Sequence, residues 1–188
     1  KESIGDWLLS NFNLENAAAA TAFAQARGID WNLIKKTFKN FKGVPGRMEY
    51  IKQGPFAVVI DYAHTPDSLA KIYNALSGDN RRGKTRKLIC VLGAAGGGRD
   101  KWKRPVLGKI ASEHCREIIL TNEDPYDEPP QQIIAEIRAG ISNARFSHAN
   151  LHEILDRRAA IQKALALAKK GDIVVITGKG SEDWIHTA

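Results

Sequence analysis

The chain has few cysteines and no long apolar run, and both absences narrow the class of protein. Its two cysteines, Cys90 and Cys115, lie in or beside apolar stretches, where a thiol usually behaves as a small buried hydrophobe. The lack of Cys-x-x-Cys or Cys/His ligand spacing argues against a disulfide framework and a zinc site. No apolar stretch approaches the ~20 residues that span a bilayer, and the first six residues lack the apolar core of a signal peptide. We therefore expect a cytoplasmic protein with no metal ligands of its own and no membrane partner.

A phosphate-gripping loop of the form Gly-x-x-x-x-Gly-Lys-Ser/Thr is also missing. The glycines at 93 and 96–98 are followed by Arg99, and Gly178-Lys179-Gly180 has no serine or threonine directly after its lysine. The first stretch does not fit Gly-x-Gly-x-x-Gly either, so a dinucleotide site is not indicated. We therefore expect part of a nucleotide site at most, and assign no catalytic residue.

The chain is basic, with a net charge of +7, which favours anionic partners in general. Much of this charge, including Lys35, Lys36, Lys39 and Lys42, is expected on one solvated helix face. Aromatic residues are not interleaved with the basic ones as stacking platforms for nucleic acid require. We therefore expect no nucleic-acid partner. A nucleic-acid-binding domain would instead be retained on polyanion, with a steep salt dependence.

The first quarter of the chain is predicted to be helical. An alanine-rich helix over 13–27 precedes Gly28, a residue suited to a helix C-terminus, and Asp30 is a good N-cap for a second helix that reaches about residue 40. The stretch Gly43-Val44-Pro45-Gly46 then breaks the chain. We place a domain boundary here, between residues 1–46 and 47–188.

Strands and helices alternate in the remainder. Short apolar runs predict buried strands over 56–60, 88–92, 118–120 and 173–176, with a weaker one at 151–155. Caps and prolines predict helices that begin at Thr65 and run over 104–115, 129–142 and 156–170. This order predicts an α/β, Rossmann-like domain: a mostly parallel sheet with helices on both faces.

A polar, turn-rich cluster follows each strand, where ligands bind in such sheets. Asp61 and His64 would hold a ribose or a phosphate chain, or else only satisfy the backbone donors of a turn; both interpretations are equally supported. Arg99 follows glycines that allow close backbone approach, and its planar fork suits a carboxylate. Glu123 and Asp124 would receive an ammonium, or serve only as helix-start acids.

Five motifs occur in the order in which one enzyme family carries them. They are Phe12-Asn13-Leu14-Glu15-Asn16-Ala17, Pro45-Gly46-Arg47-Met48-Glu49, Asp61-Tyr62-Ala63-His64-Thr65-Pro66-Asp67, Gly97-Gly98-Arg99-Asp100 with Lys103-Arg104-Pro105, and Gly178-Lys179-Gly180-Ser181-Glu182-Asp183. Together they extend over nearly the whole chain. The chain resembles the Mur ligase family, and the second and third motifs are most similar to its UDP-N-acetylmuramoyl-tripeptide synthetase branch.

The resemblance implies a three-domain cytoplasmic enzyme of peptidoglycan synthesis. Such an enzyme uses ATP and Mg²⁺ to phosphorylate the carboxylate of a UDP-muramoyl-dipeptide, and the amine of an amino acid then attacks the acyl phosphate. The central domain supplies the phosphate loop and the magnesium ligands. Residues 1–46 would be the helical end of that central, ATP-binding domain, and residues 47–188 the C-terminal domain.

The resemblance also implies roles for individual residues. Those near ATP would be Asn13, Asn16, Arg47, Asp61 and His64. Those at the amino-acid substrate would be Arg99, Glu123, Asp124, Tyr126, Gly178 and Glu182, with Arg99 on the carboxylate and Glu182 on an ammonium.

One motif departs from the family pattern. Branch members that use meso-diaminopimelate carry Asp-Asn-Pro-Arg after the third strand, where the arginine clamps the distal carboxylate; here the sequence is Glu123-Asp124-Pro125-Tyr126. A neutral tyrosine cannot form a bidentate clamp, and two acids nearby would repel a carboxylate. We therefore predict that the added amino acid is not meso-diaminopimelate, and that lysine or ornithine is favoured.

A second hypothesis is an isolated α/β module that binds a nucleotide or an amino acid without catalysis. A gene that encodes a phosphate loop upstream of Lys1 would favour the ligase, whereas a natural start near Lys1 would favour the module. In either case this chain alone is expected not to transfer phosphate.

Overall fold

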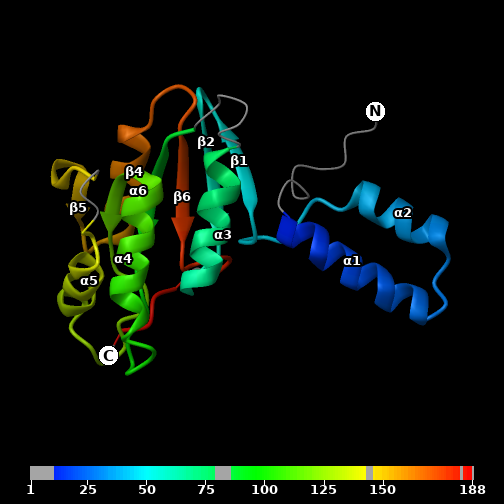
Figure 1. The fold of residues 1–188 in the computed structure, drawn as a ribbon, viewed down its shortest axis with the longest axis horizontal. Coiled ribbons are helices and arrows are strands. Elements are labelled where there is room, and N and C mark those ends of the chain that lie inside the picture. The colour runs from blue at the N-terminus through cyan, green and yellow to red at the C-terminus, as the bar shows by residue number, and fades with distance from the viewer. Residues whose placement is uncertain (1–10, 79–85, 143–145, 183, 188) are drawn as a thin grey trace.

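Two parts of unequal size make up the chain in the computed structural model, which describes residues 11–78, 86–142, 146–182 and 184–187 (Figure 1). Helices α1 (Asn11–Ala26) and α2 (Trp31–Asn40) form a hairpin beside an α/β domain. The elements of this domain are β1 (Glu49–Gln53), β2 (Phe56–Asp61), α3 (Pro66–Ser77), β3 (Leu88–Leu92), α4 (Lys103–His114), β4 (Cys115–Leu120), α5 (Pro130–Ala139), the 3₁₀ turn η3 (His148–Asn150), β5 (Leu151–Glu153), α6 (Arg157–Leu167) and β6 (Ile173–Thr177).

The sheet has six strands in the order β1-β2-β6-β3-β4-β5, and only β1 is antiparallel to its neighbour. The predicted, mostly parallel sheet is therefore confirmed. Because β6 lies between β2 and β3, the loops that follow these three strands lie side by side. Asp61 at the end of β2 pairs in register with Thr177 at the end of β6.

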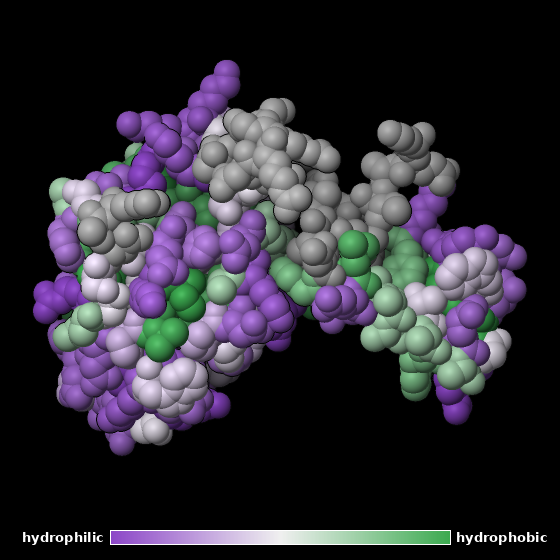
Figure 2. All heavy atoms as spheres, viewed as in Figure 1, coloured by the Kyte–Doolittle hydropathy of each residue, from purple (hydrophilic) through white to green (hydrophobic). Residues whose placement is uncertain are grey.

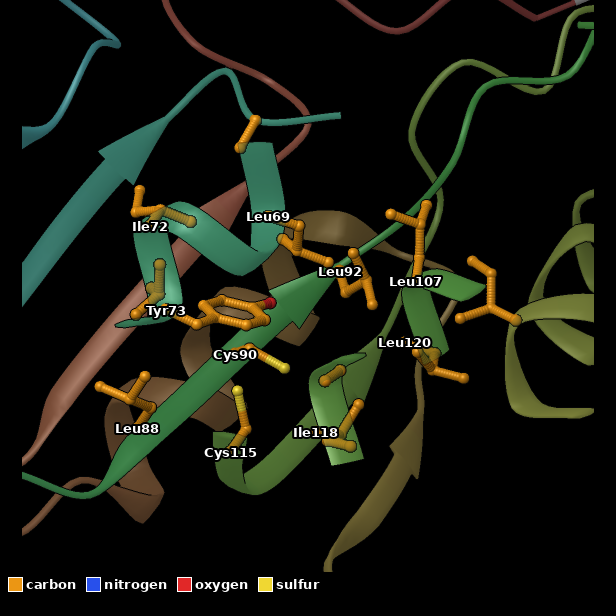
Figure 3. Packing of buried hydrophobic residues seen from close by; sticks show 14 of the residues in the cluster. Leu69, Ile72, Tyr73, Leu88, Cys90, Leu92, Leu107, Cys115, Ile118 and Leu120 are labelled. Carbon is orange, nitrogen blue, oxygen red and sulfur yellow. The ribbon is translucent and has the colours of Figure 1, made fainter. Parts of the chain in front are cut away.

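Helices cover both faces of the sheet, as predicted. Residues of α3, α4 and α5 pack on one face, and Figure 3 shows Leu69, Tyr73 and Leu107 against the side chains of β3 and β4. On the other face α6 packs through Ala160 and Ala164. Both cysteines are buried free thiols in this interior, as their apolar surroundings indicated.

The predicted caps are present. The Thr65 hydroxyl accepts from the Ser68 N–H in a capping box, and Pro66 occupies the first turn of α3. The side chains of Asp30 and Asp156 cap α2 and α6. These local signals determined where the helices begin.

The ends of some elements, and one whole strand, differ from the prediction. Helices α5 and α6 stop at Ala139 and Leu167, each three residues earlier than expected. Gly140 follows the last residue of α5, and a Cβ at this position would overlap the carbonyl oxygen of Pro105. Strand β1 was missed because Glu-Tyr-Ile-Lys-Gln has no continuous apolar run; it lies at the sheet edge, paired with β2 alone.

The helical hairpin leaves much apolar surface uncovered by the described residues. None of the described side chains of α1 is buried, and in α2 only Ile34 is. Leu14, Phe23 and Leu33 expose 53%, 70% and 55% of their surface. Figure 2 shows this hydrophobic surface on the smaller lobe. Within the described ranges, no helix has the length and apolarity needed to cross a membrane.

Candidate functional site

A cavity of about 970 Å³ lies between the hairpin and the α/β domain. Four of the five residues predicted near ATP line it: Asn13, Asn16, Arg47 and Asp61. Most of the wall is apolar and comes from α1 and α2, but α3 adds polar residues, among them Ser68 and Lys71, that the sequence reasoning missed. Both residues come shortly after the last residue of the Asp61 motif, Asp67, and this closeness in the sequence could have indicated that they belong to the same site.

Asp61 satisfies backbone donors, as the structural interpretation of its motif proposed. Its two carboxylate oxygens accept from the N–H groups of Met48 at 2.8 Å and Ala63 at 2.7 Å. Burial raises the pKa of Asp61, although these hydrogen bonds and the charge of Arg47 oppose the increase. The carboxylate thus ties β1 to the turn after β2.

His64 is not brought into this cavity. It is exposed, its Nδ1 lies 2.9 Å from the carbonyl oxygen of Tyr62, and its ring packs edge-on against the Tyr62 ring. The Tyr62 ring also contacts a cation, because the Arg47 guanidinium lies 4.4 Å from its centre. His64 therefore holds the turn in this conformation.

The loops that follow β3, β4 and β6 meet at the carboxyl edge of the sheet. The Gly96 N–H donates to the Asp124 carbonyl at 2.7 Å, and a Cβ at Gly97 would touch the ring of Tyr126. A Cβ at Gly178 would overlap the carboxylate of Glu123. Four predicted substrate residues, Glu123, Asp124, Tyr126 and Gly178, are thus in one cluster.

Arg99 lies in the glycine-rich loop after β3, next to the glycines that contact this cluster. Gly97, Gly98 and Asp100 around it have positive φ angles of 67°, 71° and 41°. The two glycines adopt such angles without steric cost, which allows the sharp loop. Arg99 is exposed, so its guanidinium is accessible to a carboxylate.

Glu123 is buried, with 5% of its surface exposed, and its Oε2 has no hydrogen-bond partner. Desolvation raises the pKa of this carboxyl to about 7, even though the charges of Arg157, Lys103 and Lys179 act in the opposite direction. Glu123 is therefore close to half protonated at neutral pH.

Asp124 already has an ammonium partner within the chain. The Lys179 Nζ lies 2.6 Å from its Oδ2, and the His186 N–H donates to its Oδ1 at 2.8 Å. Lys179 also lies over the ring of Trp184, 4.5 Å from its centre. Asp124 is paired with a cation and Glu123 is partly protonated, so the two acids repel a substrate carboxylate less than the sequence suggested. Their charge is therefore a weaker reason to exclude diaminopimelate.

Tyr126 and Glu182 are likewise engaged by the chain. The Tyr126 ring stacks on His186 with centroids 5.1 Å apart, and the backbone N–H of Tyr126 donates to the His186 carbonyl. Glu182 accepts from the Gly180 N–H at 2.8 Å. Partial burial would raise the pKa of Glu182, but backbone hydrogen bonds and the Lys179 charge lower it overall. Glu182 is thus an ionised acid beside the loops, and Tyr126 supplies no positive charge.

The cavity between the hairpin and the α/β domain has the general character of a small-molecule site. Two amide side chains and an arginine line it among mostly apolar residues. Across the described ranges, no three or more His, Cys, Asp or Glu side chains group as metal ligands. Asn13, Asn16 and Arg47 are among the side chains of this cavity that would contact ATP if it bound here.

The comparison with known families covers the α/β domain. The family model described as Mur ligase, glutamate ligase domain, matches residues 46–180. The chain belongs to the Mur ligase family. The matched region includes the loops after β3 and β4 and the first residues of the loop after β6.

Relatives in this family extend the similarity to the hairpin. UDP-N-acetylmuramoyl-L-alanyl-D-glutamate–2,6-diaminopimelate ligases of Syntrophomonas wolfei and Aquifex aeolicus are 45% and 43% identical over 178 and 177 residues, 94% of this chain. A solved structure of a ligase of this name is 37% identical, with a TM-score of 0.68 over 96% of this chain and 35% of that one. A folylpolyglutamate synthase of Mycobacterium tuberculosis, with 21% identity and a TM-score of 0.65 over 90% of this chain and 38% of its own, shares the fold. The chain spans about a third, 35%, of the length of the curated relatives.

Proposed function

We propose that this chain is the amino-acid-binding part of an ATP-dependent ligase that adds an amino acid to a UDP-N-acetylmuramoyl-dipeptide. The observation that carries the proposal is that the loops after β3, β4 and β6 meet, with an exposed Arg99 in the first and an ionised Glu182 in the last. A guanidinium and a carboxylate are the groups that recognise the carboxylate and ammonium of a free amino acid. The relatives at 45% and 43% identity are named for such a ligation. Peptidoglycan precursors are made where ATP is available, so we also propose the cytoplasm as the compartment.

The hairpin supports a domain boundary near residue 46. We propose that residues 1–46 end the central, ATP-binding domain and that residues 47–188 form the C-terminal domain; residues 1–10 lie outside the described ranges. The apolar faces of α1 and α2 are exposed in this chain, which fits helices whose packing partner is the rest of an ATP-binding domain.

In the proposed reaction, ATP would supply the phosphoryl group that activates the dipeptide carboxylate, and Mg²⁺ would neutralise charge on the phosphates. The chain's own residues position the other reactant. Arg99 binds the carboxylate of the amino acid and Glu182 attracts its ammonium, which loses a proton before the amine attacks the acyl phosphate. Arg47 and the two asparagines hold the nucleotide at the hinge. Positioning and charge neutralisation, rather than proton transfer by this chain, account for its contribution.

We propose further that meso-diaminopimelate is a poor substrate, although the relatives are named for it. The supporting observation is Tyr126, which stacks on His186 and offers no cationic fork to a second carboxylate. A basic amino acid such as lysine or ornithine has no second carboxylate to bind.

The full-length ligase that contains this chain tests these proposals. Phosphate release would be measured with UDP-muramoyl-dipeptide, ATP, Mg²⁺ and a panel of diaminopimelate, lysine, ornithine and alanine. We expect lysine or ornithine to give the highest kcat/KM. A higher value for diaminopimelate would refute the selectivity alone. No amino-acid-dependent phosphate release with any member of the panel would refute the ligase and favour the non-catalytic module. The 188-residue chain by itself is expected to show no ATP hydrolysis.

A further inference from the structure

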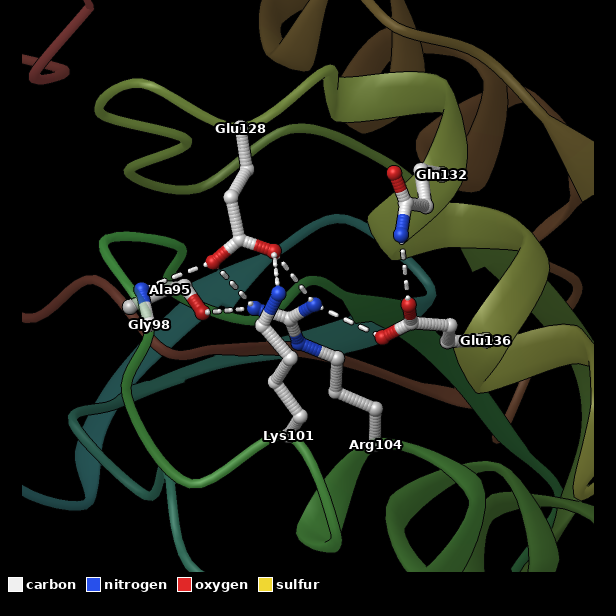
Figure 4. Close-up of polar contacts among 7 residues, drawn as sticks. All are labelled: Ala95, Gly98, Lys101, Arg104, Glu128, Gln132 and Glu136. Atoms are coloured by element: carbon white, nitrogen blue, oxygen red, sulfur yellow. Dashed lines mark hydrogen bonds and ion pairs between the residues drawn. The ribbon is translucent and has the colours of Figure 1, made fainter.

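Arg104, near the start of α4, is a charged side chain with no exposed surface. Its Nη1 donates to Glu136 at 2.7 Å and to Glu128 at 3.0 Å, and its Nη2 donates to Glu128 at 3.1 Å and to the Ala95 carbonyl at 3.0 Å (Figure 4). A buried guanidinium needs such compensation, since a lone buried charge is strongly destabilising. Glu128 thereby forms a bidentate pair with Arg104.

Glu128 receives two further donors from the glycine-rich loop. The Gly98 N–H donates to its Oε1 at 2.8 Å, and the Lys101 ammonium lies 3.0 Å from its Oε2. With Arg104 these make four contacts, which is about the acceptor capacity of an ionised carboxylate. Glu128 therefore has no acceptor left for a substrate, and its contacts connect parts of the chain.

The Glu128 carboxylate holds the glycine-rich loop at Gly98, the residue before Arg99. Gly98 directly precedes Arg99, and both Gly98 and Asp100 have positive φ angles. The Arg99 N–H reaches the Gly96 carbonyl only at 3.4 Å, a weaker bond than the 2.8 Å contact of Gly98 with Glu128. The Gly98 bond is thus the firm attachment next to Arg99.

We propose that Glu128, held by the buried Arg104, is a positioning residue that fixes the direction in which Arg99 meets the carboxylate of the incoming amino acid. The identity of that ligand rests on the proposed function. The attachment of the loop does not, so it can be tested separately.

The first test uses the 188-residue chain. Glu128→Gln keeps the size of the side chain but removes its charge and one acceptor oxygen. Glu136→Gln is the matched control, because Glu136 also contacts Arg104 but makes no contact with the Gly98 backbone. We expect ¹⁵N relaxation to show lower order parameters at Gly98 and Arg99, and faster amide exchange at Gly98, in Glu128→Gln and not in Glu136→Gln. Unchanged values in a folded Glu128→Gln chain would overturn the proposal. If that variant does not fold, Glu128→Asp, which keeps the charge but shortens the reach, is measured instead with the same expectation.

The second test is a double-mutant cycle in the full-length ligase. Glu128→Gln is expected to raise KM for the amino acid about tenfold while kcat and KM for ATP change less than about twofold. In an Arg99→Ala background the same substitution is expected to add little, because Glu128 acts through Arg99. An equal effect with and without Arg99 would overturn the positioning role. If the wild-type ligase shows no amino-acid-dependent turnover, the proposed function fails, while the relaxation measurement still decides whether Glu128 fixes the loop.

Discussion

The buried Glu123 makes the stability of this domain depend on pH near neutrality. Its pKa of about 7 in the folded chain exceeds the ordinary value of 4.5, mainly through desolvation, so the folded state binds this proton more tightly than the unfolded state. The contribution of protonated Glu123 to the free energy of unfolding is fully present below pH 4.5 and is lost as the pH rises through 7.

Glu123→Gln should therefore flatten the pH profile of stability. Between about pH 4.5 and 8.5 we expect the wild-type chain to lose about 3 kcal/mol more than the variant, from a difference of about 2.5 pH units. Urea unfolding at several pH values measures this difference. Parallel profiles for the two chains would show that the pKa of Glu123 does not change on folding.

Tyr126 tests the source of amino-acid selectivity. In the full-length ligase, Tyr126→Arg should raise kcat/KM for meso-diaminopimelate relative to lysine by about tenfold, since a charge-assisted bond contributes roughly 1.5–3 kcal/mol. Tyr126→Phe keeps the ring that stacks on His186 and should leave this ratio unchanged. A competition assay with both amino acids gives the ratio directly. No gain for diaminopimelate with arginine at 126 would place its selection elsewhere.

At the scale of elements, α4 and α5 pack closely because glycines leave room for backbone contact. A Cβ at Gly108 would overlap the Ile137 carbonyl oxygen and lie 3.3 Å from a side-chain carbon of Ile141. Gly140 makes the reciprocal approach to Pro105. The two helices hold the Arg104 network between them.

Gly108→Ala is expected to destabilise the chain by about 1–3 kcal/mol, although alanine in a helix is ordinarily favoured over glycine by about 1 kcal/mol. Thermal and urea unfolding would measure the change. Gly171→Ala serves as the comparison, because its φ of 88° is strained for alanine but no atom lies within 4 Å of an added Cβ. A stabilised Gly108→Ala chain would show that α4 and α5 separate at little cost.

The sequence predicted what local chemistry determines, and missed what depends on distant contacts. Apolar runs indicated β2, β3, β4 and β6, and the Thr65 and Asp156 caps gave two helix starts. The edge strand β1 owes its conformation to pairing with β2, and its own residues carry no such signal.

In the candidate site, too, some features were predictable from the sequence and others were not. Loop positions followed from parallel topology, so the gathering of Glu123, Tyr126 and Gly178 was predictable. The polar contacts between these loops were not predictable, because they join residues far apart in the sequence. Lys179 and Asp124 are 55 residues apart, and Glu128 and Gly98 are 30 residues apart. Without these contacts, Asp124 looked like a free acid.

At the scale of the whole molecule, we propose that the exposed apolar surface of α1 and α2 packs against the remainder of the full-length ligase. Leu33 and Phe23 are mostly exposed, so Leu33→Ser and Phe23→Ser should change the unfolding free energy of this chain by less than about 0.5 kcal/mol. In the full-length ligase the same substitutions should lower the melting temperature, because they would then leave polar groups in a packed interface. Equal effects in the two proteins would mean that α1 and α2 stay exposed.

The exposed Arg99 is the centre of the functional proposal, and its removal tests the account most directly. Amino-acid-dependent phosphate release by the full-length ligase would be compared for wild type, Arg99→Ala and Lys170→Ala, the last removing an exposed positive charge beyond α6. We predict that Arg99→Ala raises KM for the amino acid by at least about tenfold, the loss of one charge-assisted contact, while KM for ATP and the Lys170→Ala enzyme stay near wild type. An unchanged KM for the amino acid in Arg99→Ala would contradict the assignment of this domain as the amino-acid-binding part of the enzyme.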